Sequence, residues 1–270
     1  MDARQEYPIG IFDSGIGGLT VATAISKVLP DEQLVYFGDT AHLPYGDKSL
    51  GLIQEYSIKI AKFLIEVKNC KAIVIACNTA SAAAYSFLRD ELKGKLPVIN
   101  VIDPMVEFVI QNPNIHHVGI IATKTTIASG VYQEKLSRRK SDLIYSTLAT
   151  PLLAPMIEEG FIHNSISQSV LHEYLGHQEL QDIDSLVLAC THYPLIKKEI
   201  SDYYQDKILI LDSAEIVAAK LKMIMQKEQL LNNNKIHKEH QFYVSDLTTS
   251  FQETTKVFYG QRIALREKKL

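Results

Sequence analysis

The stretch that decides the fold is Ile73-Val74-Ile75-Ala76-Cys77-Asn78-Thr79-Ala80, and a second version of it is Leu186-Val187-Leu188-Ala189-Cys190-Thr191-His192-Tyr193. In each, a short aliphatic run leads to Ala-Cys and then to small polar residues. Such a run predicts a buried parallel strand, and the polar residues stand where a helix N-cap would stand. Each cysteine is therefore expected at the carboxyl end of a strand, where ligands bind in open α/β sheets.

Outside these stretches, strand and helix patterns alternate, which predicts parallel sheets with helices on their faces. A Gly-rich turn at residues 13–18 gathers backbone N–H groups in a way that suits an anion, although a tight turn that needs glycine is the alternative. The other expected elements that matter below are a helix at 126–137, a Pro-containing loop at 149–160, and a charged tail at 266–269 that is either a solvated helix end or frayed.

The strand pattern restarts near Val118. Gly119 follows Gly10 by 109 residues, and Cys190 follows Cys77 by 113. The glycine of the first strand and the cysteine are thus almost equally spaced in the two halves. This agreement indicates an internal duplication, so the two cysteines are expected in equivalent settings.

Composition excludes several classes of protein. A net charge of −3, from 28 Lys and Arg against 31 Asp and Glu, gives no electrostatic case for a nucleic-acid or membrane partner. No stretch approaches the roughly 20 apolar residues that span a bilayer, and the polar residues 1–7 do not resemble a signal peptide. Three cysteines are too few for a disulfide framework, which favours the reducing cytoplasm and free thiols.

The chemistry of the paired cysteines has four interpretations. A catalytic nucleophile needs one cysteine and one base, a redox pair is more often C-x-x-C, and zinc requires four ligands at short spacings. The fourth interpretation uses both thiols as acid and base on opposite faces of one carbon. The duplication favours this last interpretation, a racemase or epimerase, and packing remains the better interpretation for Cys70.

Local settings were expected to activate both thiols. A free thiol has a pKa of about 8.5, and a helix N-terminus or a polar partner can lower it. His192 lies two residues beyond Cys190. Asp13 is expected near Cys77, because successive strand ends line one edge of a sheet.

At these residues the chain resembles the glutamate racemases of the cofactor-independent aspartate/glutamate racemase superfamily, over about residues 9–213. The resemblance is carried by the motifs at residues 10–18, 38–40, 43–46, 76–81, 151–158 and 190–195. It implies an α/β fold of two pseudo-symmetric lobes, each a mainly parallel sheet flanked by helices, with the active site in the cleft between them. The implied lobes are residues 1–98 with 211–270, and residues 99–210.

The resemblance also implies a function. It is the interconversion of L- and D-glutamate without a cofactor or metal, supplying D-glutamate for peptidoglycan. Cys77 would exchange the α-proton of D-glutamate with support from Asp13, and Cys190 that of L-glutamate. His192 with Glu158 would support Cys190 or the ammonium group. The implied substrate contacts are Asp13, Ser14, Pro44, Tyr45, Gly46, Asn78, Thr79, Thr123, Thr126, Thr191 and His192.

Several alternatives stay open. One is a relative acting on aspartate, hydantoins or maleate, although the Asp-Ser-Gly and Pro-Tyr-Gly motifs favour glutamate. Another is a protein that binds an amino acid without turnover, which the two intact cysteines argue against. The sequence leaves a homodimer open, and it does not tell whether Glu158 or Glu159 faces the cleft. Because only residues 1–7 precede the first strand, activation by a cell-wall precursor is not expected.

Charge in the expected site suggests how a dicarboxylate is held. Its motifs contain no Arg, and Lys124 is the only Lys beside them. We therefore hypothesise that neutral donors and helix dipoles bind the substrate. Ala122 stands where the family pattern has glycine, which bears on how closely the backbone approaches the substrate there.

Overall fold

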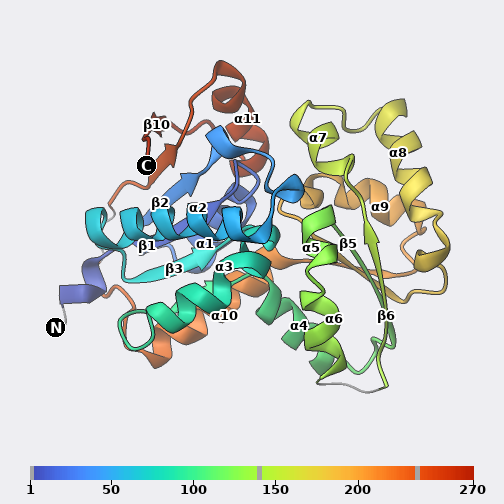
Figure 1. Ribbon diagram of the computed structural model, residues 1–270, viewed down its shortest axis with the longest axis horizontal. Coiled ribbons are helices and arrows are strands. Elements are labelled where there is room, and N and C mark those ends of the chain that lie inside the picture. The colour runs from blue at the N-terminus through green and yellow to red at the C-terminus, as the bar shows by residue number, and fades with distance from the viewer. Residues whose placement is uncertain (1–2, 139–141, 235–237) are drawn as a thin grey trace.

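The computed structural model describes residues 3–138, 142–234 and 238–270. Residues 1–2 and 235–237 of the expected first lobe, and 139–141 of the expected second, lie outside these ranges. The chain forms two parallel sheets flanked by helices, which lie side by side in Figure 1. This confirms the predicted α/β architecture.

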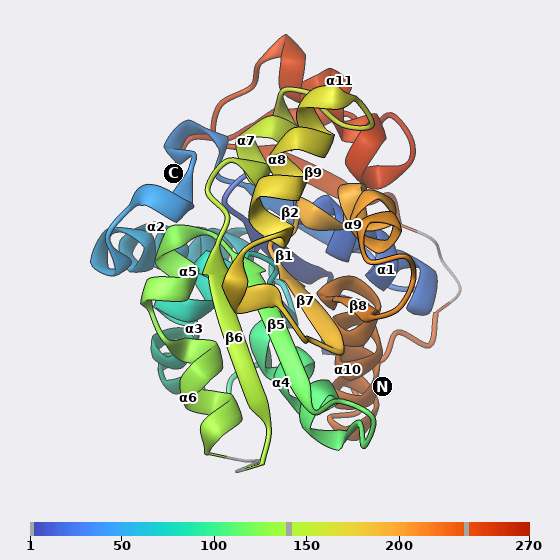
Figure 2. The ribbon, with the colours of Figure 1, turned by 90° about the vertical axis from the view of Figure 1, so that its right-hand side faces the viewer.

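The first sheet has the strand order β10-β9-β2-β1-β3-β4, and all its neighbouring strands are parallel. Its strands are β1 (Ile9–Asp13), β2 (Leu34–Gly38), β3 (Ala72–Ile75), β4 (Val98–Asn100), β9 (Gln241–Val244) and β10 (Leu265–Glu267). The second sheet has the order β6-β5-β7-β8 and is seen in front in Figure 2. Its strands are β5 (His117–Ala122), β6 (Ile144–Ala149), β7 (Ser185–Ala189) and β8 (Leu209–Asp212).

The two sheets repeat one topology. The order β2-β1-β3-β4 in the first matches β6-β5-β7-β8 in the second. Gly10 lies in β1 and Gly119 in β5, while Cys77 follows β3 and Cys190 follows β7. The equivalence that the residue spacing predicted is therefore present in space.

Helices cover the sheets on both sides. Around the first sheet lie α1 (Leu19–Val28), α2 (Leu50–Lys62) with a π-helical turn at Phe63–Val67, α3 (Asn78–Glu91), α10 (Ser213–Lys227) and α11 (Thr249–Tyr259). Around the second lie α4 (Ile102–Gln111), α5 (Lys124–Ala128), α6 (Val131–Ser137), α7 (Leu153–Glu158), α8 (Ser165–Leu175) and α9 (Lys197–Tyr203). Helix α10 packs against both α1 and α4, so it joins the two lobes.

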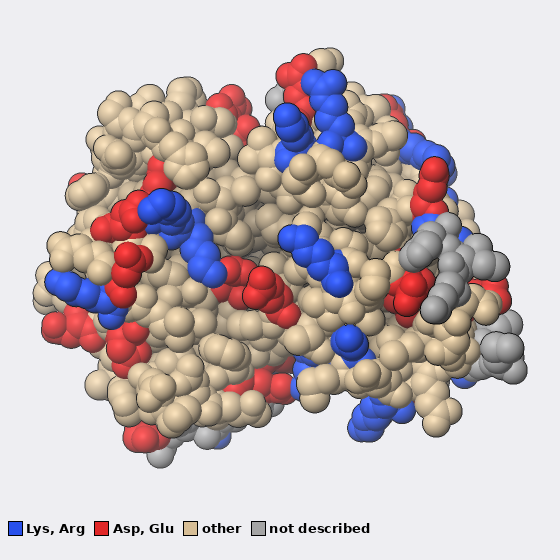
Figure 3. Space-filling view, turned by 180° about the vertical axis from the view of Figure 1, so that it is seen from behind, with Lys and Arg blue, Asp and Glu red and all other residues tan. Residues whose placement is uncertain are grey.

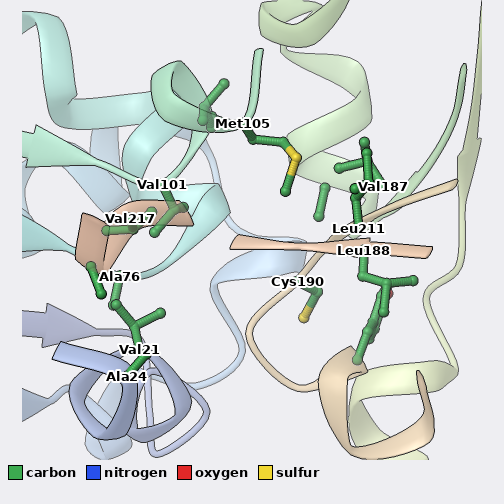
Figure 4. Packing of buried hydrophobic residues seen from close by; sticks show 14 of the residues in the cluster. Val21, Ala24, Ala76, Val101, Met105, Val187, Leu188, Cys190, Leu211 and Val217 are labelled. Atoms are coloured by element: carbon green, nitrogen blue, oxygen red, sulfur yellow. The ribbon is translucent and has the colours of Figure 1, made fainter. Parts of the chain in front are cut away.

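The apolar core is continuous between the lobes. Ile9 and Ile11 face a cluster that extends into the second lobe, whereas Phe12 faces a second cluster on the other side of the first sheet. This alternation follows from the two-residue period of a strand. In Figure 4, Met105 of α4 reaches between Val101 on the first-lobe side and Val187 on the second-lobe side. The two lobes therefore share one apolar cluster.

Four expected elements are corrected by the structure. Helix α4 was not predicted, and α7 lies inside the expected loop at 149–160, because each helix carries a proline in its first turn, where proline is tolerated. The helix expected at 126–137 is divided at Gly130, which has φ 66°. The tail at 266–269 does not form a helix end, since Leu265–Glu267 pairs with β9 as a charged edge strand.

The expected lobe boundaries, after residues 98 and 210, fall inside β4 and β8. Strand β4 pairs with β3 of the first sheet, and β8 pairs with β7 of the second. We therefore propose that the chain changes lobe at residues 100 and 212. Both crossings then lie directly after a strand.

The surface is of mixed charge on the face in Figure 3, where Lys and Arg side chains lie among Asp and Glu. Neither sign forms a continuous field on this face. Within the described ranges, no helix combines the length and the apolar character needed to cross a membrane.

Candidate functional site

A pocket lies between the two lobes at the carboxyl ends of their strands. It encloses about 670 Å³, part of which is open to solvent. Ser14 follows β1 and Thr123 follows β5, while Cys77 follows β3 and Cys190 follows β7. Equivalent positions of the two lobes therefore face one common space.

Most of the predicted site residues line this pocket. They are Ser14, Pro44, Tyr45, Gly46, Cys77, Asn78, Thr79, Thr123, Glu158, Cys190, Thr191 and His192. Asp13 and Thr126 do not line it, because both are fully buried behind the lining residues. The hydroxyl of Thr126 lies 3.1 Å from the hydroxyl of Thr79, which lines the pocket.

Other lining residues were not predicted as site residues. They are Leu43, Asp47, Lys124, Thr150, Pro151, Ala154, Pro155 and Ala189. Thr150 directly follows β6, as Ser14 directly follows β1 and Thr123 directly follows β5. Its position directly after a strand is therefore the signal that could have found Thr150.

Cys77 is the N-cap of α3, a role that was expected for Asn78 or Thr79. Its Sγ accepts a hydrogen bond from the backbone N–H of Ala80 at 3.4 Å and donates to Ser14 Oγ at 3.7 Å. Burial, followed by the negative charge of Asp13, raises the pKa of the Cys77 thiol to about 12, although Ala80 and Ser14 oppose this. The expectation of a lowered pKa is wrong for Cys77, because desolvation outweighs the helix N-terminus.

Asp13 organises the Gly-rich turn behind Cys77. Its Oδ2 accepts the backbone N–H groups of Gly15 at 3.1 Å and Gly18 at 3.0 Å. Its Oδ1 lies 3.5 Å from the hydroxyl of Thr191 in the other lobe. Burial raises the pKa of Asp13, while His192 and the two N–H groups act in the opposite direction.

Cys190 has a different local setting from Cys77. Residues Tyr193–Ile196 form a short 3₁₀ turn before α9, so Cys190 does not stand at an α-helix N-terminus as expected. Its partner is His192, whose Nδ1 lies 3.6 Å from Cys190 Sγ. Cys190 thus contacts the side chain of His192, whereas Cys77 contacts the backbone N–H of Ala80.

His192 connects Cys190 to a carboxylate. Its Nε2 lies 2.8 Å from Glu158 Oε1, and its ring packs edge-on against Phe258 of α11. Burial lowers the pKa of His192, but its contacts with Cys190 and Glu158 outweigh burial and raise it well above the ordinary value. Glu158 lines the pocket whereas Glu159 is exposed, which answers a question that the sequence left open.

Hydroxyl groups tie the lobes together around the pocket. Thr79 Oγ1 of the first lobe lies 3.0 Å from Thr123 Oγ1 of the second. Next to this contact, Thr125 Oγ1 donates to the backbone carbonyl of Gly46 at 2.7 Å. Both bonds join a first-lobe residue to a second-lobe residue.

Lys124 stands at the pocket rim. Its Nζ lies 3.8 Å from Asp47 Oδ1, and both side chains are 62% exposed. It is the only Lys or Arg among the lining residues, all of which fall within the described ranges. The rest of the lining offers hydroxyl, amide, thiol and imidazole groups, together with the Glu158 carboxylate.

Comparison with known proteins identifies the family. The model described as Asp/Glu/Hydantoin racemase matches residues 20–221. The glutamate racemase of Neisseria meningitidis serogroup C is 39% identical over 257 residues, covering 95% of this chain and 94% of that protein. The glutamate racemase of Chlorobaculum tepidum is 40% identical over 259 residues, covering 96% and 94%. The crystal structure of glutamate racemase from Francisella tularensis in complex with D-glutamate has a TM-score of 0.91 and 36% identity, with 98% of both chains covered. The chain therefore belongs to the Asp/Glu/Hydantoin racemase family and, within it, to the glutamate racemases.

Proposed function

We propose that this protein interconverts L- and D-glutamate in the cytoplasm, supplying D-glutamate for peptidoglycan, with Cys77 and Cys190 as the acid and the base. The observation that carries the proposal is the placement of the two cysteines at equivalent strand ends of the two lobes, lining one pocket. Inversion of a carbon centre requires removal of a proton from one face and delivery to the other. Two thiols on opposite sides of one substrate meet that requirement.

The reaction balances with the groups of this chain. The Cys190 thiolate removes the α-proton of L-glutamate, so the C–H bond breaks and an S–H bond forms. The electron pair is delocalised into the α-carboxylate. The Cys77 thiol then donates its proton to the opposite face, which gives D-glutamate and leaves Cys77 as the thiolate. The reverse reaction begins at Cys77.

The electrostatics around Cys77 suit a strong base. Burial and the charge of Asp13 raise its pKa to about 12, so Cys77 is a thiol at neutral pH and its thiolate binds protons avidly. The ammonium group of a bound amino acid would favour the thiolate, because an opposite charge within about 4–6 Å stabilises an ionised group. Asp13 thus supports Cys77, and His192 with Glu158 supports Cys190.

Neutral donors are proposed to recognise the two carboxylates. Asn78 Nδ2 is buried on the pocket wall and has no hydrogen-bond partner within residues 3–138, 142–234 and 238–270. The proposed substrate contacts are Asp13, Ser14, Pro44, Tyr45, Gly46, Asn78, Thr79, Thr123, Thr126, Thr191 and His192, with Asp13 and Thr126 acting from behind the wall.

Proton NMR in D₂O tests the proposed function. The purified protein is incubated with L-glutamate, and we expect the α-proton signal to disappear while D-glutamate accumulates to an equal amount. Parallel incubations with L-aspartate and with a hydantoin test the related substrates. If only aspartate exchanges its α-proton, the substrate is aspartate and not glutamate. Exchange of none of them would favour a binding protein.

Gly17 provides a test of the contact between the lobes. A Cβ at Gly17 would lie 2.6 Å from the His192 ring and from Thr191 Oγ1. We expect Gly17→Ala to displace His192 and to lower kcat/KM for glutamate about tenfold, because small misplacements of catalytic groups are costly. The matched control is Gly51→Ala, where a Cβ meets nothing within 4 Å. Equal activities of the two variants would show that this close approach does not position His192.

A further inference from the structure

The side-chain amide of Asn78 has one satisfied and one unsatisfied end. Asn78 begins α3 and is 3% exposed, and its buried Nδ2 has no hydrogen-bond partner in the part of the chain that the structure describes. An unpaired buried donor is unfavourable unless a ligand or another group completes its hydrogen bond. Because Asn78 lines the pocket, Nδ2 is a donor available to a substrate carboxylate.

The other end of this amide is held by the opposite lobe. Tyr132, on α6, donates its hydroxyl hydrogen to Asn78 Oδ1 at 2.8 Å. Tyr132 is 2% exposed, and the pKa of its phenol is raised by burial and by the charge of Asp103. The Tyr132 hydroxyl therefore remains a hydrogen-bond donor at physiological pH. A donor pairs with the oxygen of the Asn78 amide and not with its nitrogen.

We infer that Tyr132 is a positioning residue, which fixes the Asn78 amide so that Nδ2 points to a carboxylate of the amino-acid substrate. The inference rests on the proposed function. An amide has two similar ends, and a hydrogen bond to Oδ1 determines where Nδ2 points. Since the phenol and the amide belong to different lobes, the donor is correctly oriented only while the lobes keep this arrangement. Carboxylate binding is thus coupled to the apposition of the lobes.

This role predicts a specific kinetic pattern. Tyr132→Phe keeps the buried ring and removes only the hydroxyl. We expect KM for both enantiomers to rise about tenfold, equivalent to about 1.4 kcal/mol of binding. We expect kcat to change by less than about twofold, because the amide contacts the carboxylate in both the ground state and the transition state.

The matched control is Tyr204→Phe, which removes a hydroxyl that has no hydrogen-bond partner among the described residues and does not line the pocket. It should leave KM unchanged. Melting temperatures of both variants confirm that they are folded. A fall in kcat at constant KM would contradict the inference, since Tyr132 would then act on the reacting groups.

A double-mutant cycle separates positioning from general support of the fold. In an Asn78→Ala background there is no amide to orient, so Tyr132→Phe should have no further effect on KM. An equal effect in both backgrounds would overturn the inference.

Calorimetric binding of D-glutamate distinguishes failure of the inference from failure of the proposed function. The wild type could fail to racemise glutamate while Tyr132→Phe binds D-glutamate with a dissociation constant about tenfold higher. This result would contradict the proposed function and support the positioning role. An unchanged dissociation constant would remove the positioning role. Absence of binding to the wild type would remove both.

Discussion

Cys77→Ser and Cys190→Ser each lower glutamate racemisation by a factor of about 10³ or more, which is the largest effect that we expect from single substitutions. A serine hydroxyl is a far weaker acid than a thiol, so its alkoxide is scarcely populated at neutral pH. Each variant therefore loses the group that serves one face of the α-carbon. Racemisation needs both faces, and the two losses are expected to be similar.

Hydrogen exchange assigns a face to each thiol. Because the two enantiomers have equal free energies in water, kcat/KM must be equal in the two directions for every variant, and overall rates cannot separate the roles. In D₂O, Cys77→Ser should still exchange the α-proton of L-glutamate through Cys190 without inversion. Cys190→Ser should do the same for D-glutamate through Cys77. The opposite result would assign D-glutamate to Cys190 and L-glutamate to Cys77.

Cys70→Ser is the matched control for these variants. Cys70 is also buried, but it packs in the core on one side of the first sheet and does not line the pocket. The same substitution there should retain racemisation. Full activity in Cys77→Ser or Cys190→Ser would reject the two-thiol mechanism.

His192→Asn should lower kcat about 10²-fold, the second largest expected effect. His192 is the polar side chain that contacts Cys190, at 3.6 Å, and asparagine cannot carry its positive charge. Exchange of the α-proton of L-glutamate should fall by a similar factor, whereas exchange of D-glutamate through Cys77 should be reduced less. An equal loss for both enantiomers would indicate that His192 acts on the substrate ammonium group.

Glu158→Gln tests the same group through pH. The contacts of His192 with Cys190 and Glu158 raise its pKa, so His192 keeps its proton to higher pH than an ordinary histidine. Loss of the Glu158 charge should lower this pKa and move the alkaline limb of kcat/KM toward lower pH. Glu159→Gln is the control, because Glu159 is exposed. Coincident pH profiles would show that His192 does not titrate in the active range.

The sign of the stability effect follows from the same shift. The pKa of His192 is raised in the folded state, so the protonated pair stabilises the fold fully below the pKa of an unfolded histidine, about 6.5. This contribution is lost as pH rises through the higher folded-state pKa. Glu158→Gln should therefore destabilise the protein more at pH 6 than at alkaline pH.

The sequence by itself determined every strand except β10, the parallel arrangement and the equivalence of the two cysteines. Buried parallel strands require continuous apolar runs, which are local patterns, and β3 and β7 have them. Functional side chains that directly follow such strands, such as Ser14 and Cys190, reach one sheet edge whatever the details of packing. Contiguous motifs therefore gave most of the pocket lining.

Only the tertiary structure decided the features that depend on burial and on distant partners. Desolvation reversed the expected pKa shift of Cys77, and no local pattern measures desolvation. The choice of Glu158 over Glu159, and the contacts of Tyr132 and Phe258, join residues far apart in the chain. The charged residues 266–269 have no strand pattern of their own. Strand β10 forms because its backbone pairs with the free edge of β9. Pairing and burial are properties of the folded chain, which is why a reading of successive residues cannot supply them.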